Sequence, residues 1–249
     1  DNDLKNLIRS TRLGTGKGSP DISPTAFLVD KCNNIYFSGW GSNLGGALST
    51  LNLPMTSNAF QSTTDGNDFY LAVLNEFLDS LEYATYFGGS QSTEHVDGGT
   101  SRFDKNGIIY QSVCAGCGGN NDFPIYPNPG AVSTLNNSPN CNNAVFKFDF
   151  QRPIVVADFS TPILNCTTSV NFLNHSSSNQ LSNVSYLWSF GDGINSNQIN
   201  PTHQYQNFGV YNVTLIVSSP QSCNLSDTIT KTIYVLDGSR DTLEDVTKC

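Results

Sequence analysis

The 249-residue sequence contains few charged side chains, and this scarcity limits the kinds of protein it can encode. Charged residues make up 13% of the chain, which is too few for a disordered polyelectrolyte. Only 12 lysines and arginines stand against 21 acidic residues, and the net charge of −9 argues against nucleic acid or an anionic membrane as a partner. Apolar runs such as residues 154–157 and 213–217 are too short to span a bilayer, so no membrane insertion is expected.

Methionine is nearly absent, with a single residue, whereas glycine (21), phenylalanine (15) and tyrosine (10) are abundant. Aromatic residues favour strands, and glycine together with many asparagines serves tight turns. This composition excludes a helical bundle and predicts an all-β fold built from many short strands.

Residues 1–150 contain an internal repeat. The pattern Asp-Lys-x4-Tyr-x-Ser begins at Asp30 and again at Asp104, and residues 70–75 match residues 144–149 at the same spacing. Each copy reads as a strand, an Asn/Gly turn and a second strand, which is typical of β-hairpins. Repeated four-stranded units predict β-propeller blades, and because two blades cannot close a ring of about four to eight, more blades are expected before residue 1. A chance similarity within a β-sandwich is the alternative.

The composition changes at residues 151–153, where a second segment begins. Alternate residues from Tyr211 to Val217 are apolar, which indicates a strand with one buried face. Further strands are expected at residues 156–159, 170–173, 186–190 and 230–235, and strands at such intervals form a small antiparallel sandwich. Residues 237–249 are interpreted as a linker and the start of a further domain.

Three separated motifs stand in order in the second segment: WSFGDG at residues 188–193, NPTHQY at residues 200–205 and GVYNV at residues 209–213. With these motifs, residues 153–236 resemble the PKD domain, an immunoglobulin-like module. The resemblance implies structural roles for Trp188, Gly191, Asp192, Gly193, Pro201, His203, Tyr205, Gly209 and Tyr211.

Physical reasoning gives specific expectations for these residues, and Pro201 is expected to start the approach to the strand around Tyr205. Trp188 suits the core of a central strand, and the two glycines permit a tight turn across which Asp192 can accept a hydrogen bond. We expect His203 to make a structural hydrogen bond rather than to act in catalysis. Gly209 is expected to let the chain turn into the strand of Tyr211.

Two motifs in the first segment are similar to a bacterial β-propeller repeat. Residues 54–60, PMTSNAF, correspond to its loop, and residues 83–89, YATYFGG, correspond to the end of a blade. The second copy has a different loop and no such end before residue 153. Propellers joined to PKD domains resemble large cell-surface proteins of Bacteroidetes, many of which are exported by the type 9 secretion system and some of which are associated with gliding motility.

Seven cysteines without the spacing of a zinc finger indicate an oxidising compartment. Cys114 and Cys117 form a CxxC pattern, but the glycines that follow cannot open the helix that a thioredoxin-like site needs. A second CxxC, which a four-thiolate zinc site requires, is absent from the sequence. Structural disulfides are predicted instead: Cys117–Cys141 is the preferred bridge and leaves Cys32 with Cys114, although four cysteines allow three connectivities.

The second segment is expected to carry a bridge of its own. Cys166 precedes one predicted strand and Cys223 follows another, so a Cys166–Cys223 bridge would close most of the segment and stabilise it by about 4 kcal/mol. Cys249 is then left over, and we expect its partner beyond the end of this sequence.

The sequence predicts no catalytic residue. Glu94-His95-x-Asp97 is the only cluster around a histidine, and no nucleophile motif surrounds it. Asp65, Asp68 and Asp192 offer hard oxygens on turns, but none follows the spacing of an EF-hand. Solvated turns are therefore favoured over calcium sites at these three residues, with calcium binding as the alternative, and no cofactor is predicted.

These observations predict a non-catalytic segment of a large secreted cell-surface protein that acts as an adhesin, a spacer or a binding module. The expected ligand is an extracellular protein or carbohydrate, and exposed aromatics such as Trp40 or Tyr126 are candidates for contacting it. The family resemblance implies an outer-membrane secretion or anchoring complex as a further partner. The alternative is an accessory region of a secreted protease or polysaccharide-degrading enzyme whose catalytic domain lies outside this chain.

Overall fold

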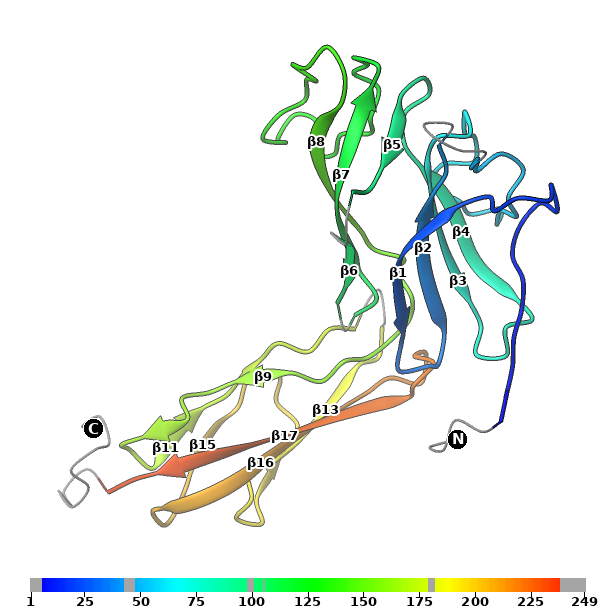
Figure 1. Cartoon of the computed structure of the whole chain (residues 1–249). Coiled ribbons are helices and arrows are strands. Elements are labelled where there is room, and N and C mark those ends of the chain that lie inside the picture. Colours follow the sequence, from blue (N-terminus) through cyan, green and yellow to red (C-terminus); the bar gives the residue numbers. More distant parts are fainter. Residues whose placement is uncertain (1–5, 43–47, 98–100, 105, 179–181, 238–249) are drawn as a thin grey trace. The chain divides into compact units, whose positions relative to one another are not determined.

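The computed structural model describes residues 6–42, 48–97, 101–104, 106–178 and 182–237 (Figure 1). Every element within these ranges is a β-strand, so the predicted all-β class is confirmed. No helix in the described part of the chain has the length and apolarity to cross a membrane. The chain divides into two compact units, Asp1–Phe150 and Gln151–Cys249. The further domain predicted at residues 237–249 lies, except for Asp237, outside the described residues.

The first unit begins with a four-stranded antiparallel meander. Its strands are β1 (Ser23–Val29), β2 (Ile35–Trp40), β3 (Phe69–Leu74) and β4 (Leu81–Phe87), paired in that order. All six side chains of β3 are buried, because both faces of the sheet are covered. One face contributes to a large aromatic core. On the other face, Tyr70 and Ala72 cluster with Tyr86 of the neighbouring β4 and with Leu53, which lies in the loop before β3.

A second sheet in the same unit is arranged around one long strand, β7 (Ile109–Cys117). The short strands β5 (Thr93–His95) and β6 (Ser101–Phe103) pair with different halves of β7, and β8 (Asn142–Phe148) pairs along most of its length. No described residue after β8 takes the place that β4 takes beside β3. The second copy of the repeat thus lacks the outer strand of the first.

The two sheets of the first unit share one aromatic core. The ring of Phe146 from β8 lies 5.4 Å from that of Phe69 and 4.5 Å from that of Phe87. Gln111 is buried at this junction, where its oxygen accepts a hydrogen bond from Ser38 Oγ and its nitrogen donates one to Thr25 Oγ1. The amide of Gln111 and the hydroxyls of Ser38 and Thr25 are therefore paired where they meet at this junction.

The repeated Asp turn has the same hydrogen-bond pattern in both copies. Asp30 Oδ1 accepts bonds from the amides of Cys32 and Asn34, and Asp104 Oδ1 accepts them from the amides of Asn106 and Ile108. The following tyrosine hydroxyl donates to the other carboxylate oxygen in each copy. The two hairpins expected from the repeat are present, whereas the propeller assignment stays a prediction and Lys105 lies outside the described residues.

The second unit is a β-sandwich. Its five-stranded sheet has the order β10-β17-β16-β13-β14, and two smaller pairs, β11-β15 and β12-β9, complete the structure. The strands are β9 (Phe159–Ser160), β10 (Leu164–Asn165), β11 (Ser169–Asn171), β12 (Leu173–Asn174), β13 (Ser185–Ser189), β14 (Asn195–Ser196), β15 (Thr202–Gln204), β16 (Gly209–Ser218) and β17 (Ser226–Val235).

The core of the sandwich follows the alternation seen in the sequence. Val213, Leu215 and Val217 from β16 are fully buried, and Trp188 from the adjacent β13 is packed beside them. The indole nitrogen of Trp188 donates to the carbonyl of Gln198 at 2.9 Å, so its only polar atom is satisfied.

The shared turn leads to a prediction about stability. Asp30→Ala should lower the free energy of unfolding of the first unit by about 2–3 kcal/mol, because four hydrogen bonds to a buried carboxylate are lost. Asp104→Ala should cost about 1 kcal/mol, since that carboxylate is partly exposed and accepts fewer bonds. Native-state hydrogen exchange of peptides from β2 and β7 measures both effects, and equal losses would contradict the ranking.

Candidate functional site

A large concave surface of the first unit lies along β8. It is a groove of about 1130 Å³, bounded on one side by the β8 strand and on the other by residues 120–136. β8 offers this groove because it is an edge strand, as no described strand pairs with its outer side.

The loop that forms the second wall is held closed by covalent and polar contacts. Cys117, at the end of β7, is bonded to Cys141, immediately before β8, which confirms the bridge expected from the sequence. The side-chain amide of Asn136 donates to the carbonyls of Gly116, Asn120 and Asn140. A loop with these anchors keeps its shape in the absence of a ligand, which lowers the entropic cost of binding.

Aromatic and apolar side chains dominate the lining of the groove. Tyr126 is 93% exposed and Val145 is 76% exposed, and Phe60 and Phe148 pack edge to face at 5.8 Å. Several asparagine amides lie among them, so the groove combines ring surfaces with hydrogen-bond donors and acceptors. Of the two aromatics proposed as ligand contacts, Tyr126 borders this groove, whereas Trp40 is half-buried and packs on the ring of His95.

Cys114 corrects the disulfide prediction for the first unit. Its thiol is free, so the expected Cys32–Cys114 pairing is wrong. Cys32 lies in the turn between β1 and β2, and Cys114 lies within β7 opposite His95, so the sheets keep the two sulfurs apart. Cys32 is itself disulfide-bonded.

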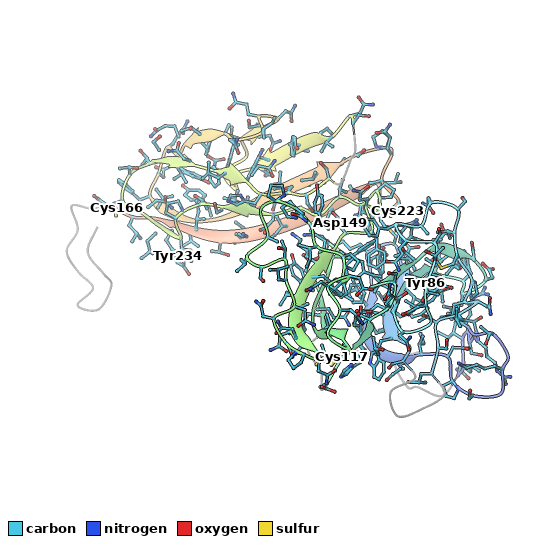
Figure 2. All side chains as sticks on the ribbon, turned by 90° about the horizontal axis from the view of Figure 1, so that it is seen from above. Tyr86, Cys117, Asp149, Cys166, Cys223 and Tyr234 are labelled. Carbon is cyan, nitrogen blue, oxygen red and sulfur yellow. A yellow bond between two sulfur atoms is a disulfide. The ribbon has the colours of Figure 1, made fainter. Side chains whose placement is uncertain are left out.

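The predicted Cys166–Cys223 bridge is also wrong, although both cysteines are disulfide-bonded. The residue before Cys166 pairs with Val235 at the end of β17, whereas Cys223 precedes the start of that ten-residue strand. Figure 2 shows the two cysteines at opposite ends of the second unit. Sequence order could not reveal this separation, because it depends on the length and direction of β17.

The turn after β13 is built around Asp192. Gly191 and Gly193 have φ angles of 84° and 92°, a region that L-residues other than glycine rarely adopt. Asp192 Oδ1 accepts a bond from the Ile194 amide, and Oδ2 accepts one from His203 Nε2 at 2.7 Å. Desolvation alone would raise the pKa of Asp192, but the bonds from His203 and Ile194 hold it below its usual value. Both carboxylate oxygens of Asp192 therefore accept hydrogen bonds within the turn, and calcium at this position stays a prediction.

His203 belongs to a stack of rings that leads from this turn into the core. Its ring is stacked on Phe190 at 4.0 Å and meets Tyr205 at 4.5 Å, and Tyr205 is stacked on Tyr211 at 4.1 Å. The Pro201 carbonyl accepts a bond from the Phe172 amide. Gly209 is already within β16 and has no positive φ, so the structure does not show the turn expected there.

The other two calcium candidates, Asp65 and Asp68, lie before β3 and differ in their burial and contacts. Asp65 accepts a bond from the Asn67 amide in a local turn. Asp68 is fully buried, and a Cβ on Gly88 would lie 2.1 Å from Asp68 Oδ1 and 2.6 Å from Glu94 Oε2. Asp68 therefore faces Glu94, which the sequence analysis did not connect with it, and calcium at this position stays a prediction.

Burial determines the proton affinity of this carboxyl pair. Desolvation, with the nearby charges of Asp65 and Glu94, raises the pKa of Asp68 to about 8. Desolvation, with a smaller contribution from Asp122, raises the pKa of Glu94 to about 6. At neutral pH Asp68 thus holds a proton, which lets two buried carboxyl groups face each other.

Three potential metal ligands that belong to separate sequence motifs lie close together beside β5. His95, Asp97 and Cys114 place one nitrogen, one oxygen and one sulfur within 4.8 Å of one another. The sequence displayed the His-x-Asp and CxxC patterns, but only the pairing of β5 with β7 brings them together.

Comparison with known families assigns the second unit. Residues 150–235 match the family model described as the PKD domain. The second unit contains a PKD domain. The domain is a non-catalytic module of immunoglobulin-like sandwich fold, in agreement with the resemblance seen in its sequence motifs.

Similar proteins share short regions with this chain. Sixty residues are 47% identical to a microbial collagenase of Vibrio alginolyticus, covering 24% of this chain and 7% of that protein. Fifty-seven residues are 47% identical to collagenase ColQ1 of Bacillus cereus strain Q1, covering 22% of this chain and 6% of that protein. The chain therefore spans less than a tenth of the length of these relatives.

Two solved structures are similar to about a third of the chain. The PKD1 domain of Vibrio anguillarum Epp is 31% identical, with a TM-score of 0.30, over 34% of this chain and 95% of that one. The PKD1 domain of the Vibrio cholerae metalloprotease PrtV is 38% identical, with a TM-score of 0.29, over 33% of this chain and 96% of that one.

The Asp68–Glu94 pair predicts an unusual pH dependence. The pKa of Asp68 is about 8 in the folded protein, above its unfolded value of 3.8. The contribution of Asp68 to the free energy of unfolding is therefore complete below pH 3.8 and is lost as the pH rises to about 8, where the buried carboxyl group gives up its proton. Asp68→Asn should flatten this profile and, at the alkaline end, stabilise the first unit by about 1 kcal/mol or more, since the amide can donate to Glu94.

Calorimetric melting with a chelator across this pH range measures the effect. Glu76→Gln, which removes one exposed carboxylate in the same unit, is the control and should leave the profile unchanged. Parallel profiles for Asp68→Asn and the unaltered protein would contradict the role assigned to the pair.

Proposed function

We propose that this chain is a non-catalytic region of a large secreted protein that acts at the cell surface as an adhesin, a spacer or a binding module. The observation that carries this proposal is the PKD domain at residues 150–235, a non-catalytic module. The Cys117–Cys141 bridge supports it, because structural disulfides persist in oxidising extracellular compartments.

The groove along β8 is the proposed binding surface, and a carbohydrate chain is the ligand class that suits it best. Exposed rings such as Tyr126 offer faces on which sugar rings pack, and the asparagines of the lining can pair with hydroxyl groups. Among the described residues, Lys147 is the one charged side chain that lines the groove, and it lies over the ring of Tyr110, so a neutral glycan fits better than a strongly charged one.

A glycan array probed with the full chain tests this proposal. Tyr126→Ala should weaken binding to any glycan retained by the unaltered protein about fivefold or more, since an exposed aromatic contact contributes on the order of 1 kcal/mol. Phe27→Ala, which removes a ring that is also exposed but lies on β1 and does not line the groove, is the matched control. If Tyr126→Ala and Phe27→Ala weaken glycan binding equally, the groove is not the binding surface. If the unaltered protein binds no glycan, the ligand is not a carbohydrate, and candidate protein ligands are then compared with the same two variants.

A second candidate is an accessory region of a secreted protease. The matches to collagenases from Vibrio and Bacillus and to the PKD1 domain of a Vibrio metalloprotease favour it. Collagen fibrils are then the appropriate probe, and cosedimentation of the full chain with them, insensitive to Tyr126→Ala, would support this candidate over the glycan-binding one.

We further propose that the first unit contributes blades to a β-propeller of the type found in Bacteroidetes surface proteins. The shared hydrogen-bond pattern of the turns at Asp30 and Asp104 supports repeated blades, as do the motifs at residues 54–60 and 83–89. Export by type 9 secretion, contact with an outer-membrane anchoring complex and an association with gliding motility follow from that class.

Localisation in the natural host tests the export route. An antibody against the PKD domain should label intact cells, and this labelling should be lost when the type 9 translocon is deleted while the protein still accumulates inside the cell. Unchanged surface labelling in the deletion strain would contradict export by this system.

A further inference from the structure

Three side chains with the chemistry of transition-metal ligands converge at one end of the second sheet. Asp97 Oδ2 lies 3.5 Å from His95 Nε2 and 3.6 Å from Cys114 Sγ. All three ligand atoms lie within 4.8 Å of one another. An imidazole, a carboxylate and a thiol are three of the groups that bind zinc in proteins.

The two separations that involve Asp97 match those required around a tetrahedral ion. Zinc binds nitrogen and oxygen at about 2.0–2.2 Å and sulfur at about 2.3 Å, so neighbouring ligand atoms lie about 3.3–3.6 Å apart. The two distances to Asp97 fit that spacing without any rearrangement of the backbone.

Strand pairing explains how the residues meet. His95 of β5 stands opposite Cys114 of β7 in the antiparallel register, and a register shift lies between Thr93 and His95. Asp97 follows two residues after His95, beyond the end of β5. The ring of His95 is half-buried and packs on Trp40, with centroids 5.8 Å apart, which restricts its orientation.

The oxidation state of Cys114 sets it apart from the other described cysteines. Five of the six are disulfide-bonded, whereas Cys114 keeps its thiol. A free thiol is vulnerable in an oxidising compartment, and coordination by a metal would protect it. The Cys114 sulfur lies 3.6 Å from a carboxylate oxygen of Asp97 and within 4.8 Å of a ring nitrogen of His95, so the thiol faces two other metal-ligating groups.

We propose that His95, Asp97 and Cys114 form a site for one zinc ion. The thiolate and imidazole select a borderline-soft metal over calcium or magnesium, and the fourth position is left for water or an external ligand. On binding, the Cys114 thiol loses its proton to solvent and sulfur donates an electron pair to the metal, with no change in oxidation state. When His95 Nε2 binds the metal, the second ring nitrogen faces Cys117 Sγ, 3.9 Å from Nδ1.

Cobalt substitution provides a direct test on the full, oxidised chain. Titration with CoCl₂ should give a thiolate-to-cobalt charge-transfer band that saturates at one equivalent, and ZnCl₂ should displace it. Cys114→Ser should abolish the band, while His95→Gln and Asp97→Asn should each weaken metal affinity at least about tenfold. Asp79→Asn, which removes another exposed carboxylate in the same unit, should change neither the band nor the affinity.

Thiol labelling supplies a second readout that does not depend on cobalt. Zinc should slow the alkylation of Cys114 by iodoacetamide in the unaltered protein, and this protection should vanish in His95→Gln. Melting temperatures without metal show whether each variant folds. An absent charge-transfer band, a band that survives in Cys114→Ser, or alkylation unaffected by zinc in the unaltered protein would each overturn the proposal, which does not depend on the glycan-binding role.

Discussion

The antiparallel pairing of β7 with strands on both of its edges is the constraint on which the first unit depends. β5 and β6 share one edge, β8 occupies the other, and the inward side chains of β7 join the aromatic core. The same pairing sets Cys114 opposite His95 on one side and places Cys117 beside Cys141 on the other. The groove, its closed wall and the metal-ligand cluster therefore all follow from the register of a single strand.

The PKD domain depends on a different interaction, a hydrogen bond that joins a polar turn to a stack of aromatic rings. Asp192 is fixed by His203, whose ring lies against Phe190 and Tyr205. The motif residues at 188–193 and 200–205 thus form one continuous group of contacts from the surface turn to the core. The side chains of these motif residues contact one another and stabilise the fold, which agrees with the non-catalytic character of the module.

Local features of the fold could be read from the sequence, because they depend on neighbouring residues. The Asp30 and Asp104 turns close through bonds between residues at most six positions apart, and the alternation in β16 records one buried face. Interactions across sheets were harder to predict. Asp68 was singled out for its oxygens, but its partner Glu94 lies in β5, and the burial that raises the pKa of Asp68 could not be inferred from the intervening residues.

The sequence by itself determined the all-β class, the paired hairpins, the PKD motifs and the presence of structural disulfides, since composition, short-range spacing and turn chemistry are sufficient for these. Only the tertiary structure decided which cysteines meet, why Cys114 stays reduced, and where the groove lies. The physical reason is the two-residue period and the register of strands: a shift of one residue would turn Cys114 or His95 to the opposite face. Contacts between distant strands are therefore fixed by the packing of whole sheets rather than by any local pattern.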